Sequence, residues 1–260
     1  MADFPTGRFC WYECYCDDPN AAATFYGKLT GWTSAPWGPG DYTVIMNGET
    51  SIGGYMQLTA EMKNMGVPPH WLLYIATDDA DATAARATEL GGRVIRAPFD
   101  IDEVGRIVVI ADPQGAVFCG FQPAGPPPGT DAPAGIGDFS WHELMTTDWQ
   151  AAWAFYSALF RWRETDRMEM GEAGTYLVYG NGAHPLGGFF NKPPEVPVPA
   201  WMLYVRVPDV DDSIETVKAS GGQVLIGPME VPGGDRIAQC LDPQGAAFAV
   251  HWVAAVGASQ

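Results

Sequence analysis

The chain has little positive charge and no long hydrophobic run. Its 260 residues include 14 lysines and arginines against 31 aspartates and glutamates, a formal net charge of −17. A surface of that sign repels nucleic-acid phosphates and acidic lipids, so we expect neither a nucleic-acid nor a membrane partner. No apolar stretch is long enough to cross a bilayer, and the opening MADFPTGR lacks the apolar core of a signal peptide. We therefore expect a cytoplasmic protein.

Cysteine is scarce, and its count of five is odd. Cys10, Cys14 and Cys16 crowd into one short segment, whereas Cys119 and Cys240 lie far along the chain. Residues two or four apart on a strand share a face but are poorly placed for a disulfide. A Cys-x-Cys metal site remains an alternative, but no second Cys/His pair stands at zinc-site spacing. We expect small buried thiols in a reducing compartment.

What the sequence does contain is a repeat with an offset of 130 residues, half its length. The stretch from Trp11 reads WYECYCDDPNAAATFY and the stretch from Trp141 reads WHELMTTDWQAAWAFY; later, ADPQGAVF is matched by LDPQGAAF. Between the halves runs PAGPPPGTDAPAGIG, whose proline and glycine content is typical of a linker. We predict one domain in residues 1–123, a linker in 124–136 and a second domain in 137–256.

Each half predicts a strand, a helix and further strands, twice over. Residues 9–16 are rich in aromatic and small apolar side chains and indicate a strand. Asp18 caps a helix, with Pro19 at its first position and Gly31 past its end. A second round starts at WLLYIAT, with Asp79 capping its helix, and DPQG forms a tight turn between the last two strands. The expected fold class is α+β, with helices on one face of curved sheets.

This order of motifs resembles the vicinal oxygen chelate superfamily, which includes glyoxalase I, extradiol dioxygenases and fosfomycin- and bleomycin-resistance proteins. The resemblance rests on two Asp-x6-Phe-Tyr stretches, on the pairs Gly91-Gly92 and Gly221-Gly222, and on two DPQGA turns. It covers nearly all of the chain outside the linker, and is strongest to tandem glyoxalase/bleomycin resistance/dioxygenase-like proteins. It implies duplicated domains, each of two paired βαβββ units whose sheet curls into a cup around the site.

The resemblance also implies where metal-using members would hold their ion. In this chain the six ligand positions are occupied by Trp11, Leu72, Cys119, Trp141, Met202 and Ala249. One thiol among six positions cannot hold a divalent ion. We therefore expect no metal and no other cofactor. The alternative is a strand register shifted by one residue, which would bring His70 or His142 closer to a ligand position and call for a divalent metal.

If Trp11 occupies a ligand position, strand alternation turns Glu13 and Tyr15 toward the cup and the neighbouring cysteines toward the helix. The cup is then aromatic and apolar, with one carboxylate in each half. The predicted ligand-binding residues are Trp11, Glu13, Leu72, Tyr74, Cys119, Trp141, Glu143, Met202 and Tyr204. Arg106 and Arg236 recur as the glutamates do, so a structural Glu–Arg ion pair is one interpretation. The others are a hydrogen-bond acceptor for a ligand and a general base.

Three functions follow as hypotheses. The first is a metal-free small-molecule-binding protein that sequesters a hydrophobic or aromatic compound, as resistance and detoxification proteins do. The second is a glyoxalase-like lyase or a dioxygenase or hydroxylase that uses a divalent metal. The third is a regulatory protein whose cups are filled by side chains. A single chain is expected to act as a pseudo-dimer or to form a homodimer, and His184 and His251 are expected at the surface.

Overall fold

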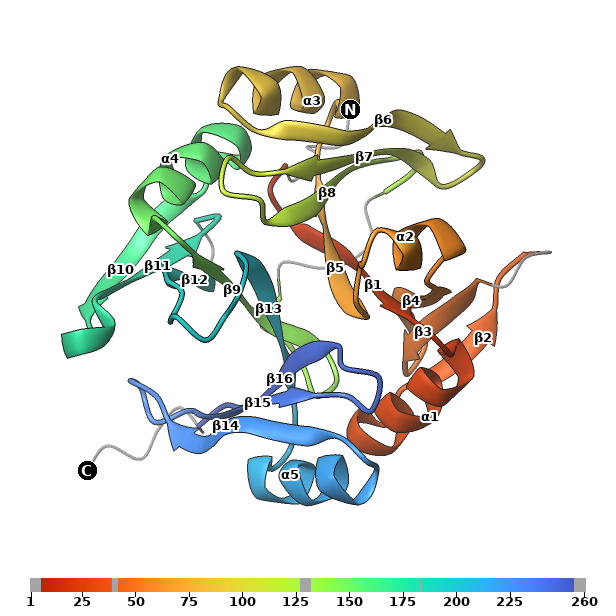
Figure 1. The fold of residues 1–260 in the computed structure, drawn as a ribbon, viewed down its shortest axis with the longest axis vertical. Coiled ribbons are helices and arrows are strands. Elements are labelled where there is room, and N and C mark those ends of the chain that lie inside the picture. The colour runs from red at the N-terminus through yellow and green to blue at the C-terminus, as the bar shows by residue number, and fades with distance from the viewer. Residues whose placement is uncertain (1–5, 39–41, 127–131, 183, 255–260) are drawn as a thin grey trace. The chain divides into compact units, whose positions relative to one another are not determined.

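The computed structural model describes residues 6–38, 42–126, 132–182 and 184–254. Part of the predicted linker (127–131) and the end of the predicted second domain (255–256) lie outside these residues. The first half of the chain contains the following elements (Figure 1): β1 (Phe9–Cys16), α1 (Pro19–Thr30), β2 (Thr33–Pro36), β3 (Thr43–Asn47), β4 (Thr50–Gln57), α2 (Ala60–Asn64), β5 (His70–Ala76), α3 (Ala80–Glu89), β6 (Arg93–Ile101), β7 (Gly105–Ala111) and β8 (Val117–Pro123).

The second half repeats this order and replaces α2 by an irregular connection. Its elements are β9 (Phe139–Thr146), α4 (Trp149–Phe160), β10 (Arg163–Glu169), the short 3-10 helix η1 (Gly171–Ala173), β11 (Thr175–Gly180), β12 (Pro185–Asn191), β13 (Ala200–Arg206), α5 (Val210–Ala219), β14 (Gln223–Glu230), β15 (Arg236–Leu241) and β16 (Ala247–Trp252). The repeat seen in the sequence is therefore a repeat of βαβββ units.

The strands form two curled, open, mixed sheets of eight strands each. Their orders are β2-β3-β4-β1-β5-β8-β7-β6 and β10-β11-β12-β9-β13-β16-β15-β14. In each half the first strand pairs in parallel with the strand that ends its unit: β1 with β4, and β9 with β12. The order is the same in both sheets, which confirms the predicted α+β class with duplicated βαβββ units.

The long helices begin at the aspartates that the sequence marked. The Asp18 side chain accepts from the backbone N–H groups of Asn20 and Ala21, and so satisfies donors that have no partner within the helix. Helix α1 ends at Gly31, whose φ of 77° is the left-handed conformation that glycine adopts without strain. The equivalent cap of α4 is Arg161, with φ of 59°. The same turn is thus made without glycine in the second half.

The DPQG turns bind two parts of the chain that are distant in sequence. Asp112 accepts three backbone N–H bonds from the residues that follow it, which closes the turn between β7 and β8. The next polar residue, Gln114, reaches the start of α4: its Oε1 accepts from Asp148 N at 2.6 Å and its Nε2 donates to Asp148 O at 2.7 Å. Gln244 makes the same two bonds with Asp18. Each turn therefore positions a helix of the other half.

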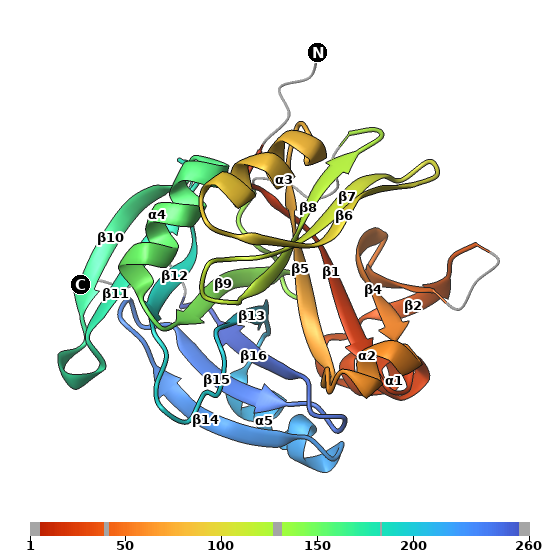
Figure 2. The same cartoon turned by 45° about the horizontal axis from the view of Figure 1, so that its top comes forward.

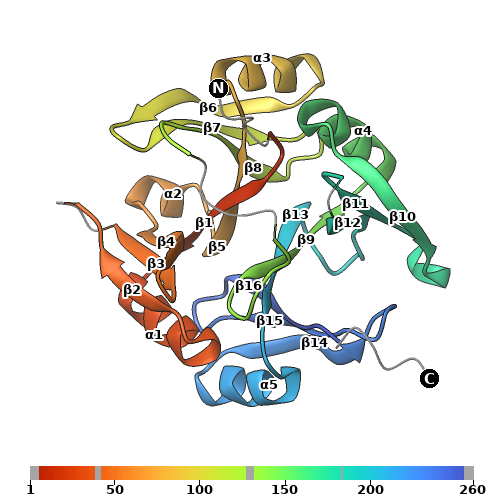
Figure 3. The ribbon, with the colours of Figure 1, turned by 180° about the vertical axis from the view of Figure 1, so that it is seen from behind.

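The chain divides into two compact units that each combine segments from both halves. Unit 1 takes the described residues within 1–11, 72–132 and 141–202; unit 2 takes those within 12–71, 133–140 and 203–260. In unit 1, helix α3 packs on β6, β7 and β8, as Figure 2 shows. In unit 2, helix α5 packs on β14, β15 and β16, as Figure 3 shows. The predicted domain limits in the sequence are not tested by this division.

A fully buried tyrosine stands at the centre of each aromatic core. In unit 2, Tyr26 accepts a hydrogen bond from Trp71 Nε1 at 2.8 Å and donates to Asp242 Oδ2 at 3.1 Å. In unit 1, Tyr156 accepts from Trp201 Nε1 at 3.2 Å. These phenols bury large apolar area while their hydroxyl groups keep partners. All five cysteines are buried and free, as expected.

Candidate functional site

A buried carboxylate lies on the first strand of each half. Glu13 on β1 and Glu143 on β9 are each 7% exposed, and a carboxylate is costly to bury without a hydrogen-bond donor. Tyr42 donates to Glu13, with 3.1 Å between Oη and Oε1. Tyr176 donates to Glu143, with 2.8 Å between Oη and Oε2. We call the Tyr42–Glu13 pair the first dyad, in unit 2, and the Tyr176–Glu143 pair the second dyad, in unit 1.

A glycine makes room for the tyrosine ring of each dyad. In the ladder between β1 and β4, Gly54 is the partner of Glu13. A Cβ at Gly54 would lie 2.2 Å from the hydroxyl oxygen of Tyr42. The second dyad has the same arrangement, because a Cβ at Gly188 would lie 2.1 Å from Cζ of Tyr176. The second glycine of each pair thus lets a tyrosine from the neighbouring strand segment cross over to the glutamate.

The predicted pairing of the two arginines with these glutamates is wrong. Arg106 bonds to Asp81 through Nε at 2.6 Å and to Asp100 through Nη1 at 2.9 Å. Arg236 bonds to Asp211 through Nη1 at 2.7 Å. Asp81 and Asp211 stand in the first turns of α3 and α5, so the arginines cross-link strand to helix. Tyrosine hydroxyl groups serve the glutamates instead.

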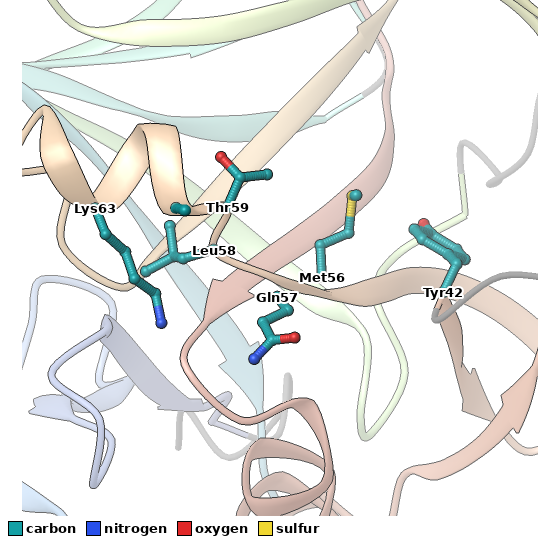
Figure 4. Close-up of a pocket in the computed structure, with 7 residues that line it drawn as sticks. Tyr42, Met56, Gln57, Leu58, Thr59 and Lys63 are labelled. Atoms are coloured by element: carbon teal, nitrogen blue, oxygen red, sulfur yellow. The ribbon is translucent and has the colours of Figure 1, made fainter.

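A cavity of about 610 Å³ opens beside the first dyad, within unit 2. Figure 4 shows Met56 and Thr59 on one side of the backbone and Gln57 and Lys63 on the other, with Tyr42 at the far end. The cavity is lined by Tyr42, Met56, Gln57, Leu58, Thr59, Ala60 and Lys63. Because Tyr42 both lines the cavity and donates to Glu13, it connects the buried carboxylate to the cavity wall.

Two aromatic pairs involve the dyad tyrosine or the strand that carries the dyad glutamate. Trp37 and Tyr42 meet edge to face, with ring centroids 6.0 Å apart. Tyr15 is the register partner of Met56 and stacks on the imidazole of His70, with centroids 5.2 Å apart and planes 6° from parallel. Burial lowers the pKa of His70, so this ring is neutral near pH 7. Flat rings of this kind suit contact with another flat ring.

The second dyad has a different covering. Trp141 donates from Nε1 to the hydroxyl oxygen of Tyr176 at 2.8 Å. Phe190 stacks on the Tyr176 ring, with centroids 5.6 Å apart and planes 29° from parallel. Phe190 is the register partner of Met145 on β9 and takes the place that Met56 has in the first half. An aromatic ring therefore covers the second tyrosine where a methionine borders the cavity at the first.

The residues at the six metal-ligand positions do not fit a metal ion. Trp11 and Trp141 are half-buried, and the other four are at most 6% exposed. Among them only Cys119 carries a thiolate, imidazole or carboxylate, the ligands that a divalent ion requires. Over the described ranges, no three His, Cys, Asp or Glu side chains come together as a metal site would require. The structure therefore offers no ligand set through which to derive a metal-dependent step.

His142, one of the two alternatives for a shifted register, has a structural position. Its ring stacks on Phe9 with centroids 3.7 Å apart, and its Nδ1 lies 3.0 Å from the carbonyl oxygen of Leu186. Burial lowers the pKa of His142 to about 3, so the imidazole is neutral. A carbonyl at this distance requires Nδ1 to carry the proton.

The remaining predicted site residues fall into two further groups. Tyr74 on β5 and Cys119 on β8 are register partners in unit 1. Tyr204 on β13 accepts a hydrogen bond from Gln239 Nε2 at 2.8 Å in unit 2. Leu72 and Met202 are buried in the strands that carry these tyrosines. The ligand-binding role given to these residues remains a prediction.

His251 is buried, so the prediction that it lies at the surface is wrong. The residue is 8% exposed. Its Nδ1 lies 2.9 Å from Ser140 Oγ and its Nε2 lies 2.9 Å from Asp235 Oδ2. His251 is the next-to-last residue of β16, where exposure is a reasonable expectation. Its ring nevertheless contacts polar side chains from β9 and from the segment before β15.

Sequence reasoning missed the tyrosines of the dyads, although a signal for them exists. The glycine pairs match at an offset of 134 residues, and Tyr42 and Tyr176 are separated by the same 134. An offset shared by a glycine and an aromatic residue indicates that the two positions are coupled. The need for glycine at positions 54 and 188 is explained only by the tyrosine ring that each glycine faces.

Comparisons with known proteins identify the family of this chain. A family model for a glyoxalase-like domain matches residues 11–121, and the model of the glyoxalase/bleomycin resistance protein/dioxygenase superfamily matches residues 138–250. The chain belongs to this superfamily. It is 34% identical over 255 residues to "Putative glyoxylase CFP32" of Mycobacterium bovis, with 96% of each chain covered. It is 32% identical over 264 residues to "Anthracycline biosynthesis protein DnrV" of Streptomyces peucetius, covering 96% of this chain and 94% of that one.

Solved structures of the superfamily share the fold at low identity. The Mn(II)-bound glyoxalase from Novosphingobium aromaticivorans matches with a TM-score of 0.66 at 15% identity, covering 96% of this chain and 82% of that chain. The 2,3-dioxygenase LapB from Pseudomonas sp. KL28 matches with a TM-score of 0.69 at 12% identity, covering 96% and 94%. Those neighbours establish the fold of this chain. Within the described part of the chain, no helix has the length and apolar character needed to cross a bilayer.

Proposed function

We propose that this chain is a metal-independent protein that binds a small planar aromatic molecule and thereby sequesters it. The observation that carries the proposal is the first dyad at its cavity. A cavity of about 610 Å³ has the size of a small-ligand site, and its tyrosine is hydrogen-bonded to a buried carboxylate. The six residues at the metal-ligand positions, which include one thiol and no imidazole or carboxylate, support binding without a divalent metal.

The dyad determines which ligands the cavity would prefer. A tyrosine that donates its proton to a carboxylate presents a hydroxyl oxygen with increased acceptor strength. Met56 and Leu58 offer apolar contact, and a methionine sulfur packs well against an aromatic ring. The site therefore suits a flat ligand with a hydroxyl donor at one end. The Streptomyces peucetius relative is named for the biosynthesis of an anthracycline, a flat polycyclic aromatic compound with phenolic hydroxyl groups, and this name supports the proposal.

The buried cysteines and the two dyads support proposals about the cellular compartment and the assembly of the chain. Five buried free thiols support the cytoplasmic location that we propose, because reducing compartments keep thiols free. One dyad lies in each unit, so a single chain supplies two versions of the same arrangement. We propose that it acts as a pseudo-dimer.

Binding of 1,8-dihydroxyanthraquinone in the presence of a chelator tests this function. We expect saturable binding by isothermal titration calorimetry, and weaker binding of unsubstituted anthraquinone, which has no hydroxyl donor. The Tyr42→Phe variant should bind about tenfold more weakly, the usual effect of losing one hydrogen bond of about 1.4 kcal/mol. Tyr176→Phe is the matched control and should change the affinity little.

Three outcomes would contradict the proposal. One is the absence of binding by this compound and by a panel of planar phenols, quinones and catechols to a folded protein. Another is binding that Tyr42→Phe leaves unchanged. Protein incubated with Fe(II), Mn(II), Ni(II) and Zn(II) and then desalted should retain far less than one ion per chain, and one bound ion per chain would also argue against it.

The name of the mycobacterial relative favours a second candidate, a glyoxalase-like lyase with a divalent metal. The substrate to test is the adduct of methylglyoxal and glutathione. Turnover that a chelator abolishes would establish this candidate in place of the first.

A further inference from the structure

A second polar cluster lies in unit 2 and includes none of the residues that line the cavity. It joins Ser140 at the start of β9, His251 on β16 and Asp235 just before β15. Ser140 Oγ lies 2.9 Å from His251 Nδ1, and His251 Nε2 lies 2.9 Å from Asp235 Oδ2. A hydroxyl, an imidazole and a carboxylate in this order can activate a serine as a nucleophile.

The protonation of the imidazole follows from its partners. Burial, helped by the nearby Arg206 charge, lowers the pKa of His251, although Asp235 opposes this shift. The ring is therefore neutral near pH 7, with one protonated nitrogen. The carboxylate accepts only, so Nε2 donates to Asp235 and Nδ1 presents its lone pair to Ser140. This is the tautomer that a general base toward the serine hydroxyl requires.

The first half of the chain shows that the contact between the first strand and the neighbouring strand does not require a Ser–His–Asp cluster. At the offset of 130 residues, Cys10 replaces Ser140 and Phe121 replaces His251. The Cys10 thiol donates to the carbonyl oxygen of Tyr74 at 3.5 Å. Ser140 Oγ lies 3.3 Å from the equivalent carbonyl oxygen, of Tyr204, but His251 Nδ1 is closer, at 2.9 Å, and takes the single hydroxyl proton in the tautomer described above. One donor at the strand start is enough for that contact. The imidazole and the carboxylate are additions of the second half.

An unused hydrogen-bond donor lies beside the cluster. Arg206 is the register partner of His251 in the ladder between β13 and β16. Its Nε is buried and has no hydrogen-bond partner among the described residues. A buried donor without a partner is costly, and in native proteins it often marks a ligand or water site. Next to a nucleophile, a guanidinium can stabilise the negative oxygen that forms during acyl transfer.

We propose that Ser140, His251 and Asp235 form an acyl-transfer site that hydrolyses small activated carboxylic esters. Ser140 Oγ attacks the ester carbonyl carbon while its proton passes to His251 Nδ1. The bond between the carbonyl carbon and the leaving oxygen then breaks, and the imidazolium returns the proton to that oxygen. Water next attacks the acyl-serine, His251 takes a proton from it, and Ser140 regains a proton as the carboxylic acid leaves. Asp235 positions the imidazole and stabilises its charged form. Ser140 is half-buried, so part of the residue is exposed to solvent, and a small ester would approach Oγ from that side.

Acylation of the full chain by 4-nitrophenyl acetate tests the site. Mass spectrometry of the digested protein should locate one acetyl group on Ser140, with release of 4-nitrophenol. Ser140→Ala should abolish this label, and Ser34→Ala, at an exposed serine on β2, should leave it unchanged. His251→Gln should lower the acylation rate about a hundredfold or more, the usual contribution of a general base.

A positioning role for Asp235 needs its own test, because Asp235 Oδ1 also accepts from Ala254 N at 2.8 Å and so secures the chain end. Asp235→Asn should lower the acylation rate at least about tenfold and shift its pH profile, whereas Asp235→Glu should restore part of the rate. A thermal unfolding scan of each variant shows which of them are folded. Label only at other residues, or equal labelling of wild type and His251→Gln when both are folded, would overturn the proposal. Loss of ligand binding at Tyr42 would not affect it.

Discussion

The two Tyr–Glu dyads use the same three residue types, yet their surroundings differ. Each joins a glutamate on a first strand to a tyrosine across a glycine. At the first dyad, Met56 borders a cavity; at the second, Phe190 stacks on the tyrosine and Trp141 donates to its hydroxyl. The dyad itself is therefore present in both halves, and we expect the residue beside it to set how much space is left for a ligand. Function in this duplicated chain is to be sought in what differs between the halves.

The largest loss of stability is expected at a feature that both halves share, the first glycine of each glycine pair. A Cβ at Gly187 would lie 1.7 Å from the carbonyl oxygen of His142, and a Cβ at Gly53 would lie 2.1 Å from that of Tyr12. Backbone atoms in a parallel ladder cannot move aside without separating the strands. We expect Gly187→Ala and Gly53→Ala each to lower the free energy of unfolding by about 4 kcal/mol, with the larger loss at Gly187, measured by urea denaturation.

Gly188→Ala is the control for that comparison. There the obstacle is the ring of Tyr176, a side chain that can rotate away at the cost of the dyad. A loss as large as that of Gly187→Ala would show that the tyrosine is held as firmly as the backbone, against expectation.

The second comparison concerns a stacked pair that each unit contains. Phe139 stacks on Tyr12 in unit 2, with centroids 3.9 Å apart, and Phe9 stacks on His142 in unit 1. Only the pair in unit 1 contains an imidazole, a group whose pKa in an unfolded chain lies near neutrality. The folded pKa of His142 is about 3 against an ordinary 6.5, so the unfolded chain binds the extra proton. His142 therefore destabilises the fold increasingly as the pH falls from 6.5 toward 3.

His142→Phe should remove this dependence. At pH 7 the variant should be about 1 kcal/mol less stable, because the carbonyl of Leu186 loses its partner. Between pH 7 and pH 5 it should gain roughly 2 kcal/mol relative to the wild type. Parallel denaturant curves across this range measure the difference. A constant gap between the two proteins would mean that His142 is not buried in the neutral form.

The third prediction exchanges the residues that distinguish the dyads. Met56→Phe should place a ring in the cavity and weaken 1,8-dihydroxyanthraquinone binding at least tenfold, an energy of about 1.4 kcal/mol, with little change in stability because the cavity has room. Phe190→Met should lose the stacking on Tyr176 and cost about 1 kcal/mol. Calorimetric titration and thermal unfolding measure the two effects. Unchanged binding by Met56→Phe would place the ligand elsewhere.

The predictability of the fold follows from the local character of its signals. Asp18 and Asp148 mark helix starts because a capping carboxylate bonds only two or three residues ahead. The DPQG turns close by bonds within four residues. The alternation of β1 needs only a period of two. Such features are contained in short windows of sequence, and duplication presents each of them twice.

The partners within the site depend on register instead, and sequence reasoning failed there. Glu13 pairs with Tyr42 because β4 places Gly54 opposite it, a fact that no short window contains. Arg106 seemed an equally good partner because an arginine recurs at the equivalent position of the second half. Its side chain instead bonds to Asp81 in the first turn of α3. Recurrence at a fixed offset shows that a residue matters to both halves and does not say which neighbour it meets.

The smallest expected effect is the difference in melting temperature between variants of Arg106 and Arg236. Arg106 bonds to two carboxylates and Arg236 to one in the described structure. The arginine side chains are 30% and 35% exposed and their carboxylate partners more than half exposed, so these ion pairs contribute little. We expect Arg106→Ala to lower the melting temperature slightly more than Arg236→Ala, with both differences shrinking in high salt.

Arg106 holds the pKa of Asp81 below its ordinary 3.8, so the stabilisation from this ion pair is complete above pH 3.8 and is lost as the pH falls through the lowered value. Melting curves at pH 7 and pH 3 should therefore show the gap between wild type and Arg106→Ala narrowing, and a gap that persists at pH 3 would mean that Arg106 acts through packing rather than charge.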